Sequence, residues 1–366
     1  MLSTPPIAAA QRPRRIATEE AFTVPEVADA MRDVVHAGGA DLDLPIVRQT
    51  YCPDAAAVGT TADLVPTSRD AWSSRMLPRL LELGADRIAR MDADGVDMHV
   101  LSLTSPGVQC FPPPLAVSLA RVANDRLADA VRAYPTRFAG LATIAPQDPA
   151  AAVREMDRAA TRLGLHGFII NSHTDGRYLD EPYFWPILEA AQALGKPIYL
   201  HPRAPSATLG GPLRDYRLEG AVWGFGVETA THVLRLMFSG TLDRFPDLTL
   251  VIGHMGEGLP FWRWRLDFMG QPGSRAGRHN ACAPGEYLAR NVLVTSSGVE
   301  DPRALRYTID TLGAERVMWA IDHPYQPMAP AVQFLDTAPL SAHEHALFAG
   351  GNAARVFGLQ SPSSHA

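Results

Sequence analysis

The chain has 366 residues, of which 46% are hydrophobic and 20% charged, with a formal net charge of -6 and a pI of about 6.1. This is a globular composition, and the small negative charge favours neither nucleic acid nor an anionic membrane as a partner. No apolar run approaches the roughly 20 residues that a helix needs to span a bilayer. The three cysteines are too scattered for a disulfide framework or a cysteine zinc site, so we expect a cytoplasmic protein.

A single domain accounts for most of the chain. We expect residues 1–14 and 361–366 to form flexible tails, and residues 15–360 to fold as one barrel domain. No interdomain linker, internal repeat or low-complexity segment interrupts that range. A chain of this length fits one α/β barrel, because such barrels commonly exceed the usual size of a domain.

Short apolar runs alternate with helical patterns along this domain. Strands are predicted at Arg15–Thr18, Met98–Leu103, Phe138–Ile144, Gly167–Asn171, Pro197–His201, Leu248–His254, Val292–Thr295 and Arg316–Asp322. Helices are predicted at Arg79–Asp94, Pro114–Ala133, Ala150–Leu163, Pro186–Leu194, Val227–Gly240 and Asp301–Leu312. Because the strands are apolar almost throughout, we expect both of their faces to be buried. The alternation predicts an α/β fold, a (β/α)8 TIM-like barrel, with a doubly wound open sheet as the main alternative.

Two segments do not fit the alternation. Phe22–Ser74 is a long insertion, and Pro202–Gly220 is a Gly- and Pro-rich loop directly after a predicted strand. Long loops at the C-terminal ends of barrel strands usually shape the substrate pocket. We therefore expect both segments to lie at the C-terminal face of the barrel.

Side chains that bind metal ions stand where four apolar runs stop. Glu19 follows the first run, His201 and His254 end two later runs, and Asp322 ends the last one. In a parallel barrel these ends converge on one face, so two imidazoles and two carboxylates there would suit a divalent metal ion. Taken singly, each residue also has an ordinary explanation as a cap, a turn residue or a structural histidine.

Other polar residues carry weaker signals. His173 closely follows a predicted strand and is a candidate for the pocket, whereas His166, His232, His343 and His345 are expected to be structural or solvated. The run Gly253–Gly258 lacks the glycine pattern of a dinucleotide site, and no phosphate loop or nucleophile elbow is present.

Several segments spread over the chain carry a family resemblance. They are Arg15–Phe22, Leu103–Gln109, Asn171–Glu181, Phe225–Thr229, Gly253–Glu257, Asn291–Thr295 and Asp322–Gln326. In these segments the chain resembles the decarboxylase branch of the amidohydrolase superfamily. That branch includes the aminocarboxymuconate-semialdehyde, γ-resorcylate and 2,3-dihydroxybenzoate decarboxylases, and the carboxyvanillate group is the most similar.

The resemblance implies a metal centre. Glu19, His201 and Asp322 would hold one divalent metal ion, manganese or zinc. His254 would lie beside the metal as a ligand or an acid–base group, with Glu257 as its partner. Position 21 is Ala where many superfamily members have a further ligand, and this weakens the interpretation as an ordinary hydrolase.

The resemblance also implies a reaction, the non-oxidative decarboxylation of a small aromatic carboxylic acid. The expected substrate is 5-carboxyvanillate or a related ortho-hydroxybenzoate. In this hypothesis the phenolate and carboxylate of the substrate bind the metal, and protonated Asp322 delivers a proton to the ring carbon that bears the carboxylate. Tyr325 and Thr104 are expected to contact the substrate, His173 to reach the pocket, and Arg265 to support it.

Some alternatives stay open at this point. The main one is a metal-dependent hydrolase of a lactone or an amide on the same barrel, and a hydratase or a non-catalytic barrel are further ones. The family expectation for assembly is a homodimer or a homotetramer. Arg69 and Arg75 are candidates for holding a second carboxylate of the substrate.

Overall fold

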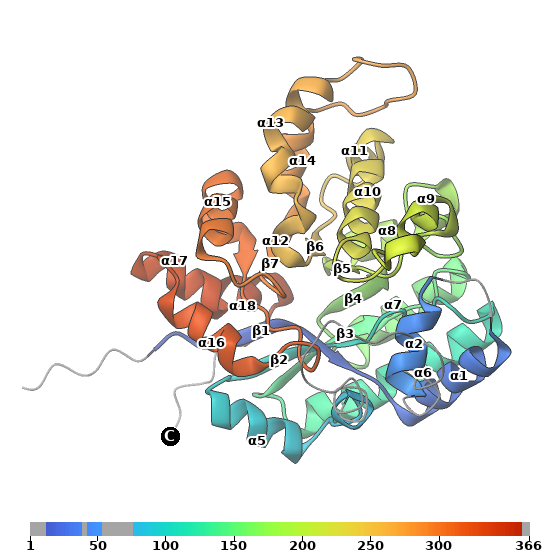
Figure 1. Ribbon diagram of the computed structural model, residues 1–366, viewed down its shortest axis with the longest axis vertical. Coiled ribbons are helices and arrows are strands. Elements are labelled where there is room, and N and C mark those ends of the chain that lie inside the picture. Colours follow the sequence, from blue (N-terminus) through green and yellow to red (C-terminus); the bar gives the residue numbers. More distant parts are fainter. Residues whose placement is uncertain (1–11, 39–41, 53–75, 361–366) are drawn as a thin grey trace, which may run out of the picture.

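The computed structural model describes residues 12–38, 42–52 and 76–360. Its strands form one parallel sheet in which each strand pairs with its neighbours in sequence. The strands are β1 (Ile16–Phe22), β2 (Met98–Leu103), β3 (Phe138–Thr143), β4 (Gly167–Asn171), β5 (Ile198–His201), β6 (Leu250–Ile252), β7 (Val292–Thr295) and β8 (Val317–Met318). The eight strands curl into a nearly closed barrel with helices around it, which confirms the predicted (β/α)8 fold (Figure 1).

Helices occupy the connections between the strands (Figure 1). Those before β5 are α1 (Pro25–Ala37), α2 (Leu44–Tyr51), α5 (Ala85–Asp94), α6 (Pro113–Ala133), α7 (Pro149–Thr161) and α8 (Trp185–Ala193). Those between β5 and β8 are α9 (Ala207–Gly210), α10 (Gly224–Phe238), α11 (Thr241–Arg244), α12 (His254–Glu257), α13 (Leu259–Met269), α14 (Pro284–Asn291) and α15 (Pro302–Leu312). After β8 come α16 (Met328–Thr337), α17 (Ala342–Ala346), the π-helical turn Leu347–Gly351 and α18 (Asn352–Phe357).

Two apolar cores explain why the strands are hydrophobic on both faces. One lies inside the barrel, where side chains from all eight strands meet residues of α18. Its members include Ile16, Met98, Leu141, Ile169, Tyr199, Val251, Leu293, Met318 and Phe357. The other lies between the sheet and the surrounding helices. Helix α6 illustrates this second core, because its buried residues Ala116, Leu119, Ala123 and Leu127 recur every three or four positions.

Three strands end more than one residue away from the predicted position. β1 continues to Phe22, so Glu19 lies inside the strand and not after it. β6 ends at Ile252 because the backbone then takes left-handed φ angles. β8 ends at Met318 because the residues after it bond to side chains and backbone of β1 outside the regular ladder.

The seam between β8 and β1 is bridged by these irregular bonds. The Thr18 hydroxyl donates to the Trp319 carbonyl oxygen at 2.8 Å. The Ala21 amide donates to the His323 carbonyl oxygen at 2.7 Å. The segment that follows β8 is therefore attached directly to the strand that carries Glu19.

The insertion predicted at Phe22–Ser74 is partly helical, since it contains α1 and α2. Its part from residue 53 to residue 74 lies outside the described residues, as do Arg69 and Arg75. The segment Pro202–Gly220 contains α9 and the 3-10 helix Gly211–Tyr216. Apolar periodicity is short and interrupted in both segments, which is why the sequence indicates loops there.

The ends of the predicted domain lie against the barrel where the structure describes them. Within the range 1–14, Arg12 forms an ion pair with Asp97, and Arg14 donates to the Thr136 carbonyl oxygen at 2.9 Å. Among the described residues, no helix has the length and apolar character needed to cross a membrane.

Candidate active site

Glu19 presents a buried carboxylate, 3% exposed, to the interior of the barrel. Its Oε2 atom accepts hydrogen bonds from the hydroxyl groups of Tyr199, Thr295 and Ser297. Its Oε1 atom has no hydrogen-bond donor among the described residues. One oxygen of the carboxylate is therefore saturated by donors, and the other is available to a cation.

Two histidines face this second oxygen. The Nε2 atom of His201 lies 3.2 Å from Glu19 Oε1, and that of His254 lies 3.8 Å from it. The Nδ1 atom of His201 donates to the Pro202 carbonyl oxygen at 2.8 Å, and that of His254 donates to Glu257 Oε1 at 2.8 Å. A neutral imidazole that donates through Nδ1 has a lone pair at Nε2. Lone pairs from both rings and from Glu19 thus converge, and a proton or a metal ion between them resolves their repulsion.

The backbone after β6 places His254 against Glu257 through a left-handed turn. Its φ angles are 52° at His254, 55° at Met255, 82° at Gly256 and 53° at Glu257. L-residues adopt this conformation at a cost, so consecutive left-handed residues mark a segment that its surroundings hold in place. The structure thereby brings together the histidine and the carboxylate that the resemblance pairs.

Gly253 lets this turn pass close to Glu19. A Cβ atom at position 253 would lie 2.8 Å from Glu19 Oε2 and 3.2 Å from Ser297 Oγ. A contact of 2.8 Å is too close for a side-chain carbon, so any other residue here would displace the carboxylate or the turn. The backbone at Gly253 is extended, with φ −79°, a conformation that any residue can adopt. Glycine is therefore needed here for close approach and not for an unusual backbone angle.

The charges of the cluster favour a cation at its centre. Burial opposes ionisation of Glu19, yet the charge of His254, the nearby ring of His201 and the hydrogen bond from Ser297 lower the pKa of Glu19 to about 2. Burial favours the neutral ring of His254, yet the carboxylates of Glu257 and Glu19 raise the pKa of His254 to about 10. These carboxylates therefore attract positive charge, whether a proton on the imidazole or a metal ion.

Asp322 lies in the segment that follows β8, with a partly exposed side chain and a left-handed φ of 73°. Burial and the negative charge of Glu19 raise the pKa of Asp322 well above its usual range, while the charge of His254 lowers it. Asp322 is thus within electrostatic reach of both Glu19 and His254. A partly exposed carboxyl group at this position can meet a substrate and can carry a proton.

Thr104 and Tyr325 meet next to Asp322. Their hydroxyl groups lie 2.6 Å apart, although the residues follow β2 and β8 respectively. Burial raises the pKa of Tyr325, and the charge of Asp322 raises it further, so the phenol stays protonated. The two predicted substrate contacts therefore form one pair of neutral hydroxyl groups beside the acidic residue.

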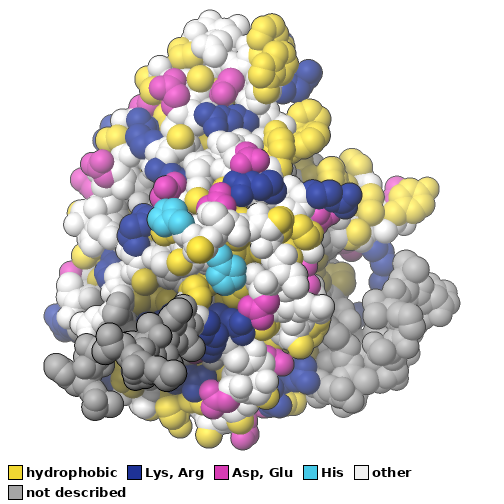
Figure 2. Space-filling view, turned by 90° about the vertical axis from the view of Figure 1, so that its left-hand side faces the viewer, with side chains coloured by type: hydrophobic (Ala, Val, Ile, Leu, Met, Phe, Trp, Pro, Cys, Tyr) yellow, Lys and Arg dark blue, Asp and Glu magenta, His cyan; other side chains and the backbone are white. Residues whose placement is uncertain are grey.

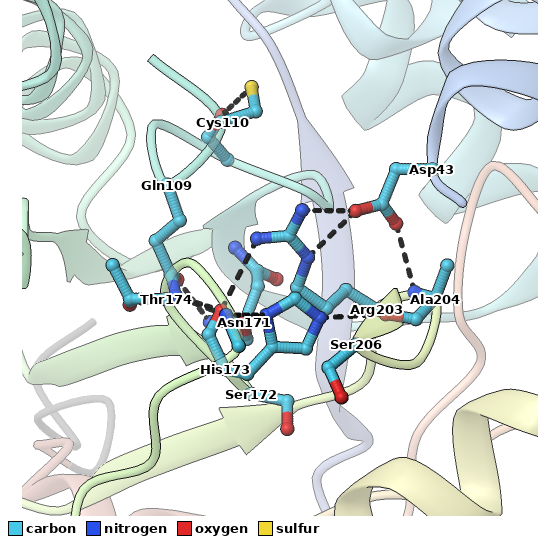
Figure 3. A network of polar contacts seen from close by, with 12 residues as sticks. Asp43, Gln109, Cys110, Asn171, Ser172, His173, Thr174, Arg203, Ala204 and Ser206 are labelled. Carbon is cyan, nitrogen blue, oxygen red and sulfur yellow. Dashed lines mark hydrogen bonds and ion pairs between the residues drawn. The ribbon is translucent and has the colours of Figure 1, made fainter. Parts of the chain in front are cut away.

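His173 lies in a different network, beyond the ends of β4 and β5 (Figure 3). Its Nδ1 atom accepts from the Gly176 amide at 3.2 Å, and its Nε2 atom donates to the Ala204 carbonyl oxygen at 3.1 Å. Next to it, Arg203 forms a buried ion pair with Asp43. Both ring nitrogens of His173 are engaged by backbone groups, so the histidine ties two loops together.

Arg265 lies apart from this cluster. It is exposed on α13, a helix that projects away from the barrel (Figure 1). The sequence places it on a helix shortly after Gly253–Glu257, but proximity along the chain does not determine which face of the helix points to the barrel.

Three residues of the site are absent from the sequence-based prediction, namely Tyr199, Thr295 and Ser297. Tyr199 precedes His201 by two positions, so strand alternation puts both on the same face. Thr295 ends β7, a strand with no acidic or histidine residue, and Ser297 stands two positions further on. Alternation around the predicted ligand positions could have identified Tyr199, but hydroxyl residues at strand ends are too common to identify the other two.

The fit of a metal ion rests on the atoms that face each other. Ligand atoms lie about 2.0–2.2 Å from an ion such as zinc, so two ligands of one ion lie roughly 3–4 Å apart. The separations of Glu19 Oε1 from the two imidazole nitrogens have this size. In the described part of the chain, no three such side chains are already closed around one point. The site is therefore indicated by acceptor atoms that lack donors, and not by a complete set of ligands around one point.

A comparison with known families gives one match that covers most of the chain. The family described as amidohydrolase matches residues 77–359. The γ-resorcylate decarboxylase of Polaromonas sp. is 37% identical over 293 residues, which cover 77% of this chain and 89% of that protein.

Solved structures show the same similarity. The crystal structure of 5-carboxyvanillate decarboxylase from Sphingomonas paucimobilis is 50% identical, with a TM-score of 0.88, and covers 95% of this chain and 100% of that one. A 5-carboxyvanillate decarboxylase from Novosphingobium aromaticivorans, in complex with manganese and 4-hydroxy-3-methoxy-5-nitrobenzoic acid, is 42% identical. Its TM-score is 0.86, with 94% of this chain and 96% of that one covered. These relatives support the decarboxylase interpretation and not the hydrolase alternative.

Proposed function

Because the chain belongs to the amidohydrolase family, we propose that it is a metal-dependent carboxy-lyase that decarboxylates a hydroxylated aromatic acid. The proposed substrate is 5-carboxyvanillate or a related ortho-hydroxybenzoate, in line with the named activities of similar proteins. The observation that carries the proposal is the unpartnered Glu19 Oε1 atom, which faces the lone pairs of His201 and His254.

Glu19, His201 and Asp322 are the proposed metal ligands, with His254 beside them. Manganese is the first candidate, since similar structures contain it, and zinc is the second. When bound, such an ion would supply Lewis-acid stabilisation of negative charge on the aromatic acid. Glu257 holds the His254 ring in place, so that its Nε2 lone pair points toward Glu19.

Asp322 is the proposed proton donor. Its carboxyl proton goes to the ring carbon that bears the carboxylate, and the bond between that carbon and the carboxylate then breaks. The electron pair of this bond restores the aromatic ring, and carbon dioxide leaves. Asp322 is left as a carboxylate and regains a proton from water. The hydroxyl groups of Thr104 and Tyr325 lie beside Asp322 and are placed to contact the phenol or carboxylate oxygens of the substrate.

The first experiment measures metal content and carbon dioxide release by the purified protein. We expect about one manganese or zinc ion per chain and release from 5-carboxyvanillate or one of several ortho-hydroxybenzoates. Bound metal with no release from any of these acids, but with turnover of lactones or amides, would contradict the proposed reaction. A chain that binds no divalent metal would contradict the proposed site.

Asp322→Asn tests the acid role. We expect kcat to fall by about 10²- to 10⁴-fold, the usual contribution of general acid catalysis. Metal content should be largely kept because Glu19 and His201 are unchanged. The same substitution at the exposed Asp29, on α1, should leave kcat unaltered. Near-normal turnover of Asp322→Asn with full metal would contradict the role of Asp322 as proton donor.

We also infer that the enzyme is a homodimer or homotetramer of the cytoplasm. Large apolar side chains are exposed on α13, including Phe261, Trp262, Trp264 and Phe268. Figure 2 shows exposed hydrophobic side chains near the top of the molecule, at the height of α13 in Figure 1. Surfaces of this kind are typical of subunit contacts. Sedimentation of the wild type and of Trp264→Glu tests this, and a monomeric wild type would contradict it.

A further inference from the structure

The segment that carries Asp322 lies outside the regular sheet. β8 comprises only Val317 and Met318, and the chain then continues to Asp322 without a strand ladder. The position of Asp322 must therefore be set by other contacts. Side chains and backbone of β1 supply them, from the strand that also carries Glu19.

Glu20 makes the two contacts nearest to Asp322. The Ile321 amide donates to Glu20 Oε1 at 3.0 Å, and the His323 amide donates to Glu20 Oε2 at 3.0 Å. These two amides flank Asp322 on either side. Glu20 is fully buried, and its carboxylate faces the segment after β8 and not the hydroxyl groups that surround Glu19, so it is not placed as a metal ligand.

The backbone at Asp322 needs such support. Its φ of 73° is a left-handed conformation, which an L-residue keeps only when its surroundings impose it. The Asp322 carbonyl oxygen accepts from the Gln326 amide at 2.9 Å, which holds the far side of the turn. On the other side of the turn, the amides of Ile321 and His323 both donate to the Glu20 carboxylate, so this side depends on Glu20.

The carboxylate of Glu20 is itself held in a polar surrounding. The buried Arg87 lies close by, and its guanidinium donates to the Ala21 carbonyl oxygen at 2.7 Å. The His99 ring lies 3.9 Å from Glu20 Oε2. Glu20 stands inside β1, so the strand fixes the backbone from which its carboxylate reaches the turn.

We propose that Glu20 is a positioning residue, whose bidentate carboxylate holds the amides of Ile321 and His323 and thereby aims the Asp322 carboxyl group at the substrate. This inference rests on the proposed function, in which Asp322 delivers the proton. Glu20 acts only through Asp322 and touches neither the substrate nor the metal.

The test is Glu20→Gln, which keeps the size of the side chain but turns one acceptor into a donor. The amide nitrogen of Gln would face a backbone N–H group, so one side of the turn would be released. We expect kcat to fall by about 10²-fold, since a displacement of about 1 Å of a catalytic group can have this effect. KM and the metal content per chain should stay within about threefold of the wild type.

Thr18→Val is the matched control. It removes the Thr18 bond to the Trp319 carbonyl oxygen, so it weakens the same seam without touching the amides that flank Asp322. We expect kcat to remain near the wild-type value. An equal loss of kcat in both variants would overturn the proposal, because it would show a general effect of the seam. So would a Glu20→Gln enzyme with wild-type kcat.

Hydrogen exchange of residues 319–325 gives a readout that needs no turnover. The amides of Ile321 and His323 should exchange slowly in the wild type and much faster in Glu20→Gln, and fast exchange in the wild type would overturn the proposal. Glu20→Asp, which is too short to reach both amides, serves the same test if Glu20→Gln does not fold. A wild-type protein that releases no carbon dioxide would contradict the proposed function. The hydrogen-exchange result would still decide whether Glu20 holds the turn.

Discussion

The clusters around Glu19 and around His173 look alike along the sequence but differ in how their polar atoms are matched. Both place a histidine at or just after the end of a barrel strand, among buried polar groups. At His173 each ring nitrogen faces a backbone group of the opposite kind, a donor for Nδ1 and an acceptor for Nε2. At His201 and His254 the Nε2 atoms face Glu19 Oε1, which is also an acceptor.

This difference distinguishes the structural cluster around His173 from the candidate binding site around Glu19. A buried acceptor without a donor is unfavourable, and acceptors of several side chains that face one another are more so, because a cation or a proton between them would relieve the repulsion. The Glu19 cluster is incomplete as a protein structure and complete with a cation. Both ring nitrogens of His173 already have backbone partners, and the bonds of this cluster join the loops after β4 and β5 (Figure 3).

The largest expected effect comes from Glu19→Gln. Loss of the negative charge and of the converging oxygen should remove the metal and lower kcat/KM by about 10³-fold, since a Lewis acid contributes several kcal/mol. His173→Gln is its counterpart in the other cluster and should lower stability while metal content is kept. Metal analysis of the two variants decides the comparison. Equal metal loss in both would contradict the division into site and scaffold.

A second prediction concerns Asp43, which pairs with Arg203 in the scaffold cluster. The pair is almost fully buried, and Asp43 also accepts from the Ala204 amide at 2.9 Å. Asp43→Asn should lower the free energy of unfolding by about 3 kcal/mol, because it removes a negative charge that is paired with a buried guanidinium. Asp29→Asn, in an exposed ion pair, should cost less than about 1 kcal/mol. Urea titration measures both, and similar values would contradict the prediction.

Gly253→Ala tests the comparison at the Glu19 cluster. The added methyl group would meet Glu19 Oε2 at 2.8 Å and push the carboxylate from its hydroxyl partners. We expect metal affinity to fall by about 10- to 100-fold, as for loss of other groups that orient metal ligands. Gly211→Ala is the control, because a Cβ atom there meets nothing within 4 Å and φ is −47°. Calorimetric titration with manganese that shows unchanged affinity for Gly253→Ala would refute the argument.

The smallest expected effect is a pH dependence of stability caused by His232. Burial lowers the pKa of this histidine to about 3, against about 6.5 in an unfolded chain. The unfolded state therefore binds more protons between these values, and stability falls as the pH drops below about 6.5.

For His232 alone, the loss between pH 7 and pH 5.5 should be about 1 kcal/mol. His232→Gln should remove that part of the pH dependence, and His36→Gln, at an exposed histidine, should not. Urea midpoints at several pH values measure it. An unaltered pH slope in His232→Gln would show that this histidine does not titrate as expected.

The sequence by itself determined the barrel and indicated the residue types of the proposed metal site. Apolar runs buried on two faces, separated by helical patterns, are compatible with few folds other than a parallel barrel, so all eight strands could be predicted. His201, His254 and Asp322 stand at or after strand ends, and the barrel brings such positions to one face whatever the loops do. Glu19 lies inside β1, where the prediction ended the strand too early.

Only the tertiary structure decided which polar atoms have a hydrogen-bond partner. Which nitrogen of His173 or His201 has a partner depends on backbone groups such as Pro202, Gly176 and Ala204, whose directions local sequence does not encode. The hydroxyl groups on Glu19 and the Glu20 bonds around Asp322 join residues separated by about 180 to 300 positions in the chain. Such long-range pairing follows from the closure of the barrel, because closure alone makes β1 and the segment after β8 neighbours.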